Sequence, residues 1–320
     1  MNVAAMHHVR FLERGSLDAN VRRPAFPHTW QEHGKVGADE IVPCLTGATI
    51  AIVNKTPFSA ETLAQLPSLA MIAVAATGTD NIDIACCRER GIVVSNIRNY
   101  AVRTVPEHAF TLILALRRNL TAYCNDVAHG LWQRSPQFCL SGHSIGDLYG
   151  STIGIVGEGA LGQGVARIAR GFGMRVLFAD HAPPKAPDVE FTPFDEMLAA
   201  SDIVSLHVPL TSHTRNLIGA RELSMMKRDA LLINTARGGL VDEQALVNAL
   251  QQGVIGGAGF DVLTVEPPRQ GNPLLELELP NFILTPHVAW ASKGAMQLLA
   301  DQLIDNVEGF VAGAPRNVVT

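Results

Sequence analysis

The chain has 320 residues, of which 47% are hydrophobic and 17% are charged, and its formal net charge at pH 7 is −5. This length allows two domains, each with a hydrophobic core of its own. The negative charge and the lack of a basic run argue against a nucleic-acid binder, and no apolar stretch reaches the roughly 18 residues of a membrane span.

The N-terminal residues and the cysteines point to a cytoplasmic protein. Met1–Arg10 has no long apolar core, so we expect no secretory signal. The five cysteines form neither a C-x-x-C pair nor a disulfide framework, which is typical of reduced thiols in the cytosol. We expect neither nucleic acid nor membrane among the partners, and no metal site.

Short apolar strands alternate with helical segments over the first hundred residues. Ser59 is suited to cap a helix that runs to Leu66, and a second helix is expected from near Asp83 to Gly91. This alternation predicts a parallel sheet. No complete phosphate-binding pattern occurs here, so we expect a smaller domain with a task other than nucleotide binding. The expected strands are Val9–Leu12, Thr49–Val53, Met71–Ala75 and Ile92–Val94.

A helix and a long arm follow this first domain. Apolar residues recur at a helical spacing at Val102, Val105, Ala109, Leu112 and Leu116. The segment from Cys124 to Tyr149 shows no such period and is too long for a simple connection. We therefore expect it to be a functional arm or part of an interface.

The centre of the chain has the pattern of a dinucleotide site. An apolar strand, Ile153–Val156, runs into Gly157, Gly159 and Gly162, and a helix and a second strand lead to Asp180. The first glycine permits a tight turn, the second lets the backbone approach a pyrophosphate, and the third lets the helix lie close on the sheet. The helix N-terminus faces the phosphates. The acid, at about the typical interval of 20 residues, is placed to accept from both ribose hydroxyls.

The same alternation continues to the end of the chain. A helix is expected from its cap at Asp242 to Gly253, and a last helix over Met296–Phe310 is expected to return to the first domain. We therefore expect an α/β protein of two Rossmann-like, doubly wound parallel-sheet domains with a cleft between them. The substrate domain would comprise residues 1–100 and 290–320, and the dinucleotide-binding domain residues 101–289. The further strands are expected to end at Leu206–His207, Ile233–Asn234, Phe260–Asp261 and Thr285–Pro286.

Three polar side chains follow strands of the second domain, where ligands sit in doubly wound sheets. Arg237 offers a planar fork that can hold a carboxylate. His287 can pass a proton near neutral pH, and Glu266 can orient an imidazole beside it. Hydride exchange between a nicotinamide and a 2-hydroxy or 2-oxo acid requires such a set, because the protein must grip the acid and handle one proton.

At these residues the sequence resembles the D-isomer-specific 2-hydroxyacid dehydrogenases over nearly its whole length. The resemblance implies that Arg237 binds substrate, that His287 is the acid/base and that Glu266 is its partner. It also implies that backbone at Thr77 and Gly78 receives the substrate carboxylate. The matching segments are Ala76–Asp83, Val105–His108, the glycine pattern, Asn234–Asp242, Gly259–Val262, Glu266–Pro267 and Thr285–His287.

The resemblance further implies a set of cofactor contacts on both sides of the glycine pattern. Asp180 favours NAD, since its carboxylate would repel a 2′-phosphate, whereas the basic His181 and Lys185 leave NADP open. The expected contacts are Thr104, Gly157, Gly159, Ala160, Leu161, Gly162, Asp180, His207, Val208, Pro209, Thr235, Ala236, Arg237, Asp261 and His287.

Within the family, Asn96–Tyr100, Leu116–Leu120 and Trp132–Cys139 look most like glycerate dehydrogenases that act as hydroxypyruvate reductases. The resemblance thus implies an NAD-dependent oxidoreductase that reduces hydroxypyruvate or glyoxylate to D-glycerate or glycolate. Another specificity, such as phosphoglycerate, stays open. So does a dinucleotide-sensing binding protein, because some relatives of this fold use the dinucleotide to control assembly in transcriptional repression. Members commonly form homodimers through the nucleotide domain, and the arm looks like the segment that reaches across.

Overall fold

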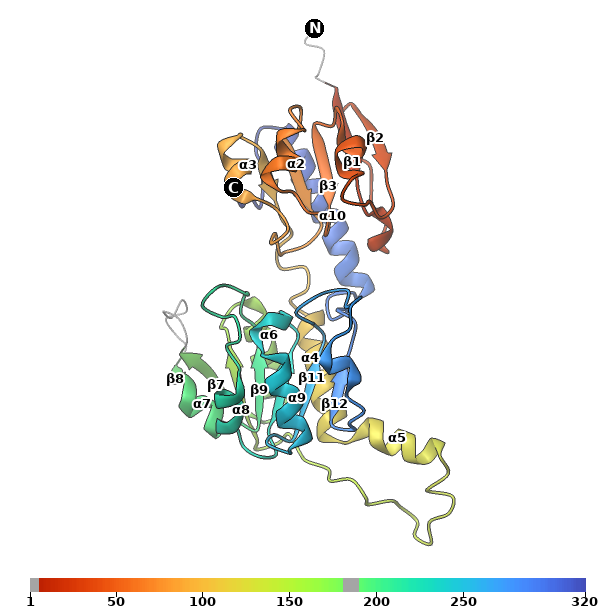
Figure 1. Cartoon of the computed structure of the whole chain (residues 1–320), viewed down its shortest axis with the longest axis vertical. Coiled ribbons are helices and arrows are strands. Elements are labelled where there is room, and N and C mark those ends of the chain that lie inside the picture. The colour runs from red at the N-terminus through yellow and green to blue at the C-terminus, as the bar shows by residue number, and fades with distance from the viewer. Residues whose placement is uncertain (1–5, 181–189) are drawn as a thin grey trace. The chain divides into compact units, whose positions relative to one another are not determined.

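The computed structural model describes residues 6–180 and 190–320 and divides the chain into two compact units, residues 1–100 with 291–320 and residues 101–290 (Figure 1). Each unit is built on a parallel β-sheet with helices packed against it. In the described part of the chain, no helix is both long and apolar enough to cross a membrane.

The described residues of the first unit form a five-stranded sheet in the order β2-β1-β3-β4-β5, with every neighbouring pair parallel. The four expected strands are present. β2 was not expected, because this edge strand reads His-Thr-Trp-Gln-Glu and buries none of its residues fully. The strands are β1 (His7–Phe11), β2 (His28–Glu32), β3 (Ile50–Val53), β4 (Met71–Val74) and β5 (Val93–Ser95).

Two helices in the first unit have the N-terminal caps that were expected from the sequence. Ser59 accepts a hydrogen bond from the Thr62 N–H, and Asp83 accepts one from the Cys86 N–H. The last helix, α10, packs on β4 and buries Leu299, Leu303 and Val307, so the C-terminal segment completes this unit. The helices are η1 (Arg14–Ser16), α1 (Ile41–Leu45), α2 (Ala60–Ala64), α3 (Ile84–Glu89) and α10 (Lys293–Val311).

The described residues of the second unit form a seven-stranded parallel sheet in the order β12-β11-β10-β9-β6-β7-β8. The strand order reverses between β6 and β9, which is where ligands bind in doubly wound sheets. β8 was not expected, because it reads Phe-Thr-Pro and buries none of its residues fully. The strands are β6 (Thr152–Val156), β7 (Arg175–Asp180), β8 (Phe191–Pro193), β9 (Ile203–Leu206), β10 (Leu231–Asn234), β11 (Gly257–Phe260) and β12 (Phe282–Leu284).

Two hydrophobic cores lie on opposite faces of this sheet. Successive residues of a strand point to opposite faces, so Ile203 packs with α4 and α6, whereas Val204 packs with α7, α8 and α9. Both sides of every central strand are buried, which explains their continuous apolar runs. The helices are α4 (Thr104–Arg117), α5 (Leu120–Ala128), α6 (Ala160–Gly171), α7 (Phe194–Ala200), α8 (Ala220–Met225), η2 (Gly238–Leu240), α9 (Glu243–Gln251) and η3 (Pro273–Glu276).

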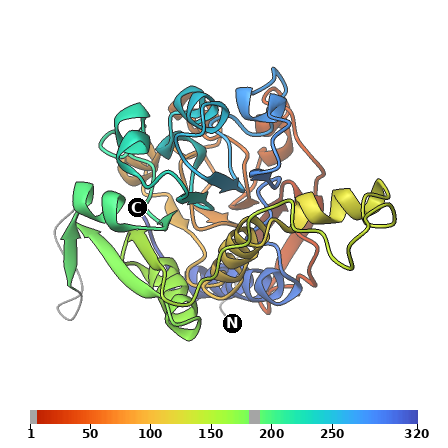
Figure 2. The ribbon, with the colours of Figure 1, turned by 90° about the horizontal axis from the view of Figure 1, so that it is seen from below.

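The arm extends away from the body of the second unit in both views (Figure 1, Figure 2). Its start differs from expectation, because α5 continues to Ala128 and the irregular segment begins after it. The helix buries only Ala122, so most of its side chains lie outside the hydrophobic core. Three aromatic side chains of the arm are open to solvent: Trp132 is 51% exposed, Phe138 92% and Tyr149 84%.

Candidate active site

Each of the three glycines after β6 occupies a different structural environment. Gly157 has φ +108°, and a Cβ there would lie 2.5 Å from the His207 carbonyl oxygen at the end of β9. A Cβ at Gly162 would lie 1.9 Å from the Gly157 carbonyl oxygen, so the turn closes directly on the helix. A Cβ at Gly159 would meet nothing within 4 Å. Two glycines are therefore required by the turn itself, and the third leaves open space at the start of α6.

This space suits a dinucleotide. Gly159 caps α6 without a side chain, so the first-turn N–H groups of the helix are available to phosphate oxygens. At the ends of β9 and β10, His207 Nδ1 and Thr235 Oγ1 are buried and have no hydrogen-bond partner among the described residues. Burial lowers the pKa of His207 to about 4, so its ring is neutral at physiological pH. The residues present thus fit a bound NAD, whose hydroxyl and amide groups could satisfy these atoms.

Asp180 is the last residue of β7 and is exposed. It ends the strand next to β6 in the sheet, as expected of an acid that binds the ribose. His181 and Lys185, which left NADP open in the sequence, lie outside the described residues.

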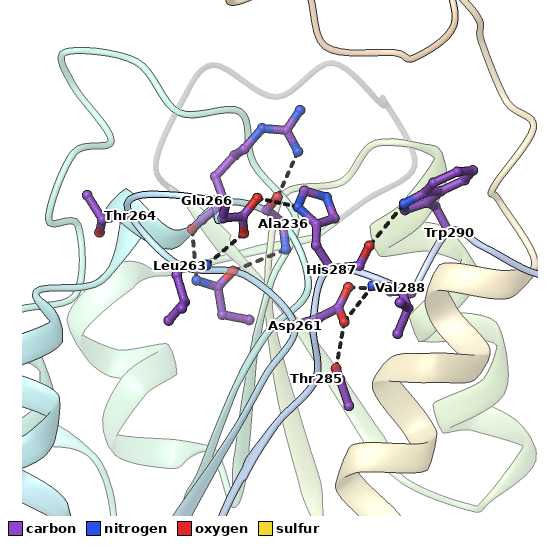
Figure 3. A network of polar contacts seen from close by, with 12 residues as sticks. Ala236, Asp261, Leu263, Thr264, Glu266, Thr285, His287, Val288 and Trp290 are labelled. Carbon is purple, nitrogen blue, oxygen red and sulfur yellow. Dashed lines mark hydrogen bonds and ion pairs between the residues drawn. The ribbon is translucent and has the colours of Figure 1, made fainter. Parts of the chain in front are cut away.

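Glu266 and His287 form a hydrogen-bonded pair (Figure 3). The distance from Glu266 Oε2 to His287 Nδ1 is 2.5 Å, and Glu266 Oε1 accepts from the Leu263 N–H at 2.8 Å. Both carboxylate oxygens are therefore held by donors. An acceptor at Nδ1 leaves Nε2 of His287 as the nitrogen that can exchange a proton with a ligand.

His287 lies in a left-handed turn, with φ +55°. Such a conformation costs a non-glycine residue on the order of 1–3 kcal/mol and persists only where the surroundings impose it. Here Asp261 imposes it, through its carbonyl oxygen, Oδ1 and Oδ2, which accept from the N–H groups of His287, Val288 and Ala289 at 2.8, 2.9 and 2.8 Å. Successive N–H groups that converge on an anion form a nest. The turn that presents His287 is built on this carboxylate.

Arg237 follows β10 in a loop shaped by the buried Asn234. The Asn234 side chain accepts from the Ala236 N–H and donates to the Arg237 carbonyl oxygen, at 3.1 and 2.8 Å. A Cβ at Gly238 would lie 2.0 Å from the Leu263 carbonyl carbon. The loop that carries Arg237 therefore packs backbone to backbone on the loop that carries Glu266, and only glycine permits this approach.

The second unit thus brings together Arg237, Asp261, Glu266 and His287, because β10, β11 and β12 are neighbours whose carboxyl ends share one edge. Figure 3 shows the network around the histidine. Thr104 donates its hydroxyl to the Ala289 carbonyl oxygen at 3.2 Å. Of the other expected cofactor contacts, Val208 is buried and Pro209 is exposed. All of these remain predictions as cofactor contacts.

Thr77 and Gly78 lie in the first unit, after β4. The Thr77 hydroxyl donates to the Ile97 carbonyl oxygen, and the Asn96 amide donates to the Thr77 carbonyl oxygen, both at 2.7 Å. These two hydrogen bonds hold the loop through the hydroxyl and the carbonyl oxygen of Thr77, and they do not use the backbone N–H groups of the loop. This arrangement suits the expected role of its backbone as a receptor for a carboxylate, which stays a prediction.

Several residues that shape the site were not among the site residues predicted from the sequence. Asn234 shapes the Arg237 loop, and Thr285 and His108 contact the Asp261 network. All three lie in segments that carry the family resemblance, but their side-chain contacts join residues far apart in the chain. In the described part of the chain, no group of three or more His, Cys, Asp or Glu side chains is arranged to hold a metal ion.

The chain is similar to several known proteins. Residues 110–289 match the family model "D-isomer specific 2-hydroxyacid dehydrogenase, NAD binding domain". The chain is 56% identical to a glycerate dehydrogenase of Methylorubrum extorquens over 97% of this chain and 98% of that protein. It is 34% identical to a hydroxypyruvate reductase of Blautia hydrogenotrophica, with 88% of each covered. The structure of a D-lactate dehydrogenase from Aquifex aeolicus, complexed with NAD and lactic acid, superposes with a TM-score of 0.79 at 29% identity over 96% of both chains.

Proposed function

This chain belongs to the D-isomer-specific 2-hydroxyacid dehydrogenase family, and we propose that it reduces hydroxypyruvate or glyoxylate to D-glycerate or glycolate with NADH. The similarity to a glycerate dehydrogenase and a hydroxypyruvate reductase supports this substrate class. The observation that carries the chemistry is the His287–Glu266 pair, which lies at the same sheet edge as the Arg237 loop.

Each polar group has one task in this proposal. When bound, NADH supplies the hydride that reduces the 2-oxo carbon. The guanidinium of Arg237 holds the substrate carboxylate through parallel N–H donors. His287 donates the Nε2 proton to the carbonyl oxygen as it becomes a hydroxyl, and Glu266 accepts from Nδ1 and stabilises the charged ring. In the reverse direction, Nε2 takes the proton from the hydroxyl of the 2-hydroxy acid.

A panel of 2-oxo acids tests the proposal. The loss of NADH absorbance would be followed with hydroxypyruvate, glyoxylate, pyruvate and 3-phosphohydroxypyruvate. We expect the highest kcat/KM with one of the first two. Fastest turnover of the phosphorylated acid would move the specificity to phosphoglycerate. Tight NADH binding without turnover of any acid would instead indicate a dinucleotide-sensing protein.

Cofactor choice should depend on Asp180. Its carboxylate would accept from the free ribose hydroxyls and repel a 2′-phosphate, so kcat/KM should be higher with NADH than with NADPH. Asp180→Ser should narrow or reverse this ratio, since it removes the repulsion. The measurement is kcat/KM with each cofactor for both proteins. The variant Asp195→Ser, at an exposed acid in the same unit, serves as a control and should leave the ratio unchanged.

The exposed arm supports a homodimer formed through the second unit. Trp132 donates from its ring nitrogen to the Phe138 carbonyl oxygen at 2.9 Å, so the arm has internal order although its aromatic faces are exposed. Exposed apolar groups of this kind mark interaction sites. Phe138→Asp should convert a dimer into a monomer in light scattering after size exclusion, whereas Gln137→Asp, at a neighbouring exposed residue, should not. A wild-type monomer would contradict the proposal.

We also propose that the enzyme is cytoplasmic. All five cysteines, which lie in the described part of the chain, are free. Burial raises the pKa of Cys87 to about 11, so this group stays a thiol. Free thiols are typical of reducing compartments. Detection of the protein in the soluble cytoplasmic fraction of its cells would support this, and detection in an exported fraction would oppose it.

A further inference from the structure

The turn that carries His287 is held from a second side, by helix α4. Thr104 and His108 lie one helical turn apart on α4 and share a face of the helix. Thr104 Oγ1 donates to the Ala289 carbonyl oxygen at 3.2 Å, and His108 Nε2 lies 2.9 Å from Thr285 Oγ1. Two side chains of α4 thus contact the chain on either side of His287.

The hydrogen bonds from His108 through Thr285 to Asp261 have a defined donor and acceptor at each step. The Asp261 side chain is 0% exposed, and its carboxylate acts only as an acceptor in these contacts. The Thr285 hydroxyl therefore donates its proton to Asp261 Oδ1, at 2.5 Å. Its oxygen is then an acceptor toward His108, so His108 Nε2 carries a proton and donates. His108 Nε2 is 3.6 Å from Asp261 Oδ1, so it acts on the carboxylate through Thr285.

This chain of bonds ends at the turn of His287. Asp261 Oδ1 accepts from both the Thr285 hydroxyl and the Val288 N–H. A displaced carboxylate would release the N–H groups of Val288 and Ala289, which hold the turn directly after His287. The imidazole would then lose its alignment with Glu266. His108 is only 19% exposed on its side chain, so water cannot readily replace its hydrogen bond.

We propose that His108 is a positioning residue for the reaction. Its Nε2–H holds Thr285 and, through it, the Asp261 carboxylate that shapes the turn of His287. The inference rests on the proposed function, in which His287 transfers the proton. His108 itself touches neither substrate nor cofactor in this role. Its effect should therefore appear in turnover and in the order of the turn, with cofactor binding unchanged.

Two substitutions at His108 separate the hydrogen bond from the volume of the ring. His108→Leu fills the site without a donor, whereas His108→Gln places an amide donor near the position of Nε2. We expect His108→Leu to lower kcat by on the order of 10-fold to 10²-fold, because small misplacements of a catalytic group have effects of this size. His108→Gln should restore most of kcat. NADH affinity, measured by fluorescence titration, should be the same in both.

Amide hydrogen exchange gives a readout that does not need turnover. A peptide covering residues 285–290 should exchange faster in His108→Leu than in the wild type, and His108→Gln should restore its protection. Thr285→Val removes the link from the other side and should act like His108→Leu. Thr111→Val is the matched control, because Thr111 lies on α4 and donates only to the Glu107 carbonyl oxygen of its own helix.

The outcomes distinguish this inference from the proposed function. Equal kcat and equal exchange in the wild type and His108→Leu would overturn the role of His108. So would an equal loss in His108→Leu and His108→Gln, which would indicate a need for the ring itself. An active His287→Gln variant would instead overturn the proposed proton transfer by His287, and a wild-type protein that reduces none of the 2-oxo acids would overturn the proposed function. If that variant is inactive and His108→Leu is normal, only the positioning role fails.

Discussion

Replacement of Arg237 by lysine should lower kcat/KM for hydroxypyruvate reduction by on the order of 10²-fold or more, equivalent to about 2.7 kcal/mol of transition-state stabilisation. The positive charge is kept, but a point ammonium cannot reproduce the planar fork that binds a carboxylate through two parallel donors. The backbone at Arg237 cannot shift to bring a lysine ammonium closer to the carboxylate, because Asn234 and the close packing of Gly238 fix it.

The control for this substitution is Arg269→Lys. Arg269 is exposed in the loop after β11 and makes no side-chain contact that the proposed mechanism uses. It should retain wild-type kinetics and NADH affinity, and both variants should keep wild-type thermal stability. Near-normal turnover of hydroxypyruvate by Arg237→Lys would remove Arg237 from the substrate site.

Replacement of His287 by glutamine should lower kcat by about 10²-fold to 10⁴-fold in both directions, the usual contribution of a general acid or base. Glutamine can occupy the space and form hydrogen bonds, but it cannot transfer a proton. NADH titration should still show binding, because the glycine turn and the N-terminus of α6 remain to hold the phosphates. Comparable turnover in wild type and variant would show that another group moves the proton.

Glu266→Gln should have a smaller effect than His287→Gln. In the wild type, the two carboxylate oxygens accept from the Leu263 N–H and from His287 Nδ1. An amide has one oxygen and one NH2 group, so it cannot accept from both the Leu263 N–H and a protonated Nδ1 of His287. The charged form of the ring, which reduction requires, also loses its counter-charge. Activity should therefore fall between those of the wild type and His287→Gln.

The sequence by itself determined the parts of the site that depend on local rules. Gly157 and Gly162 are required by one turn, and their spacing is visible without a structure. The apolar runs mark strands that are buried on both faces, and the polar residue after each run lies at the carboxyl edge of a parallel sheet. Arg237, Glu266 and His287 could therefore be selected before their contacts were known. Caps such as Ser59 and Asp242 are equally local, and each accepts the expected N–H.

Only the tertiary structure decided how these residues are held. β2 and β8 have too few apolar residues to show a period, and they form because a neighbouring strand offers its edge. His108 and Thr285 are 177 positions apart, and they meet because α4 packs on the sheet beside the end of β12. The left-handed turn at His287 depends on a carboxylate from the adjacent strand. Hydrophobic period and glycine spacing encode what a segment forms, whereas contacts across a sheet depend on strand order, which no local pattern contains.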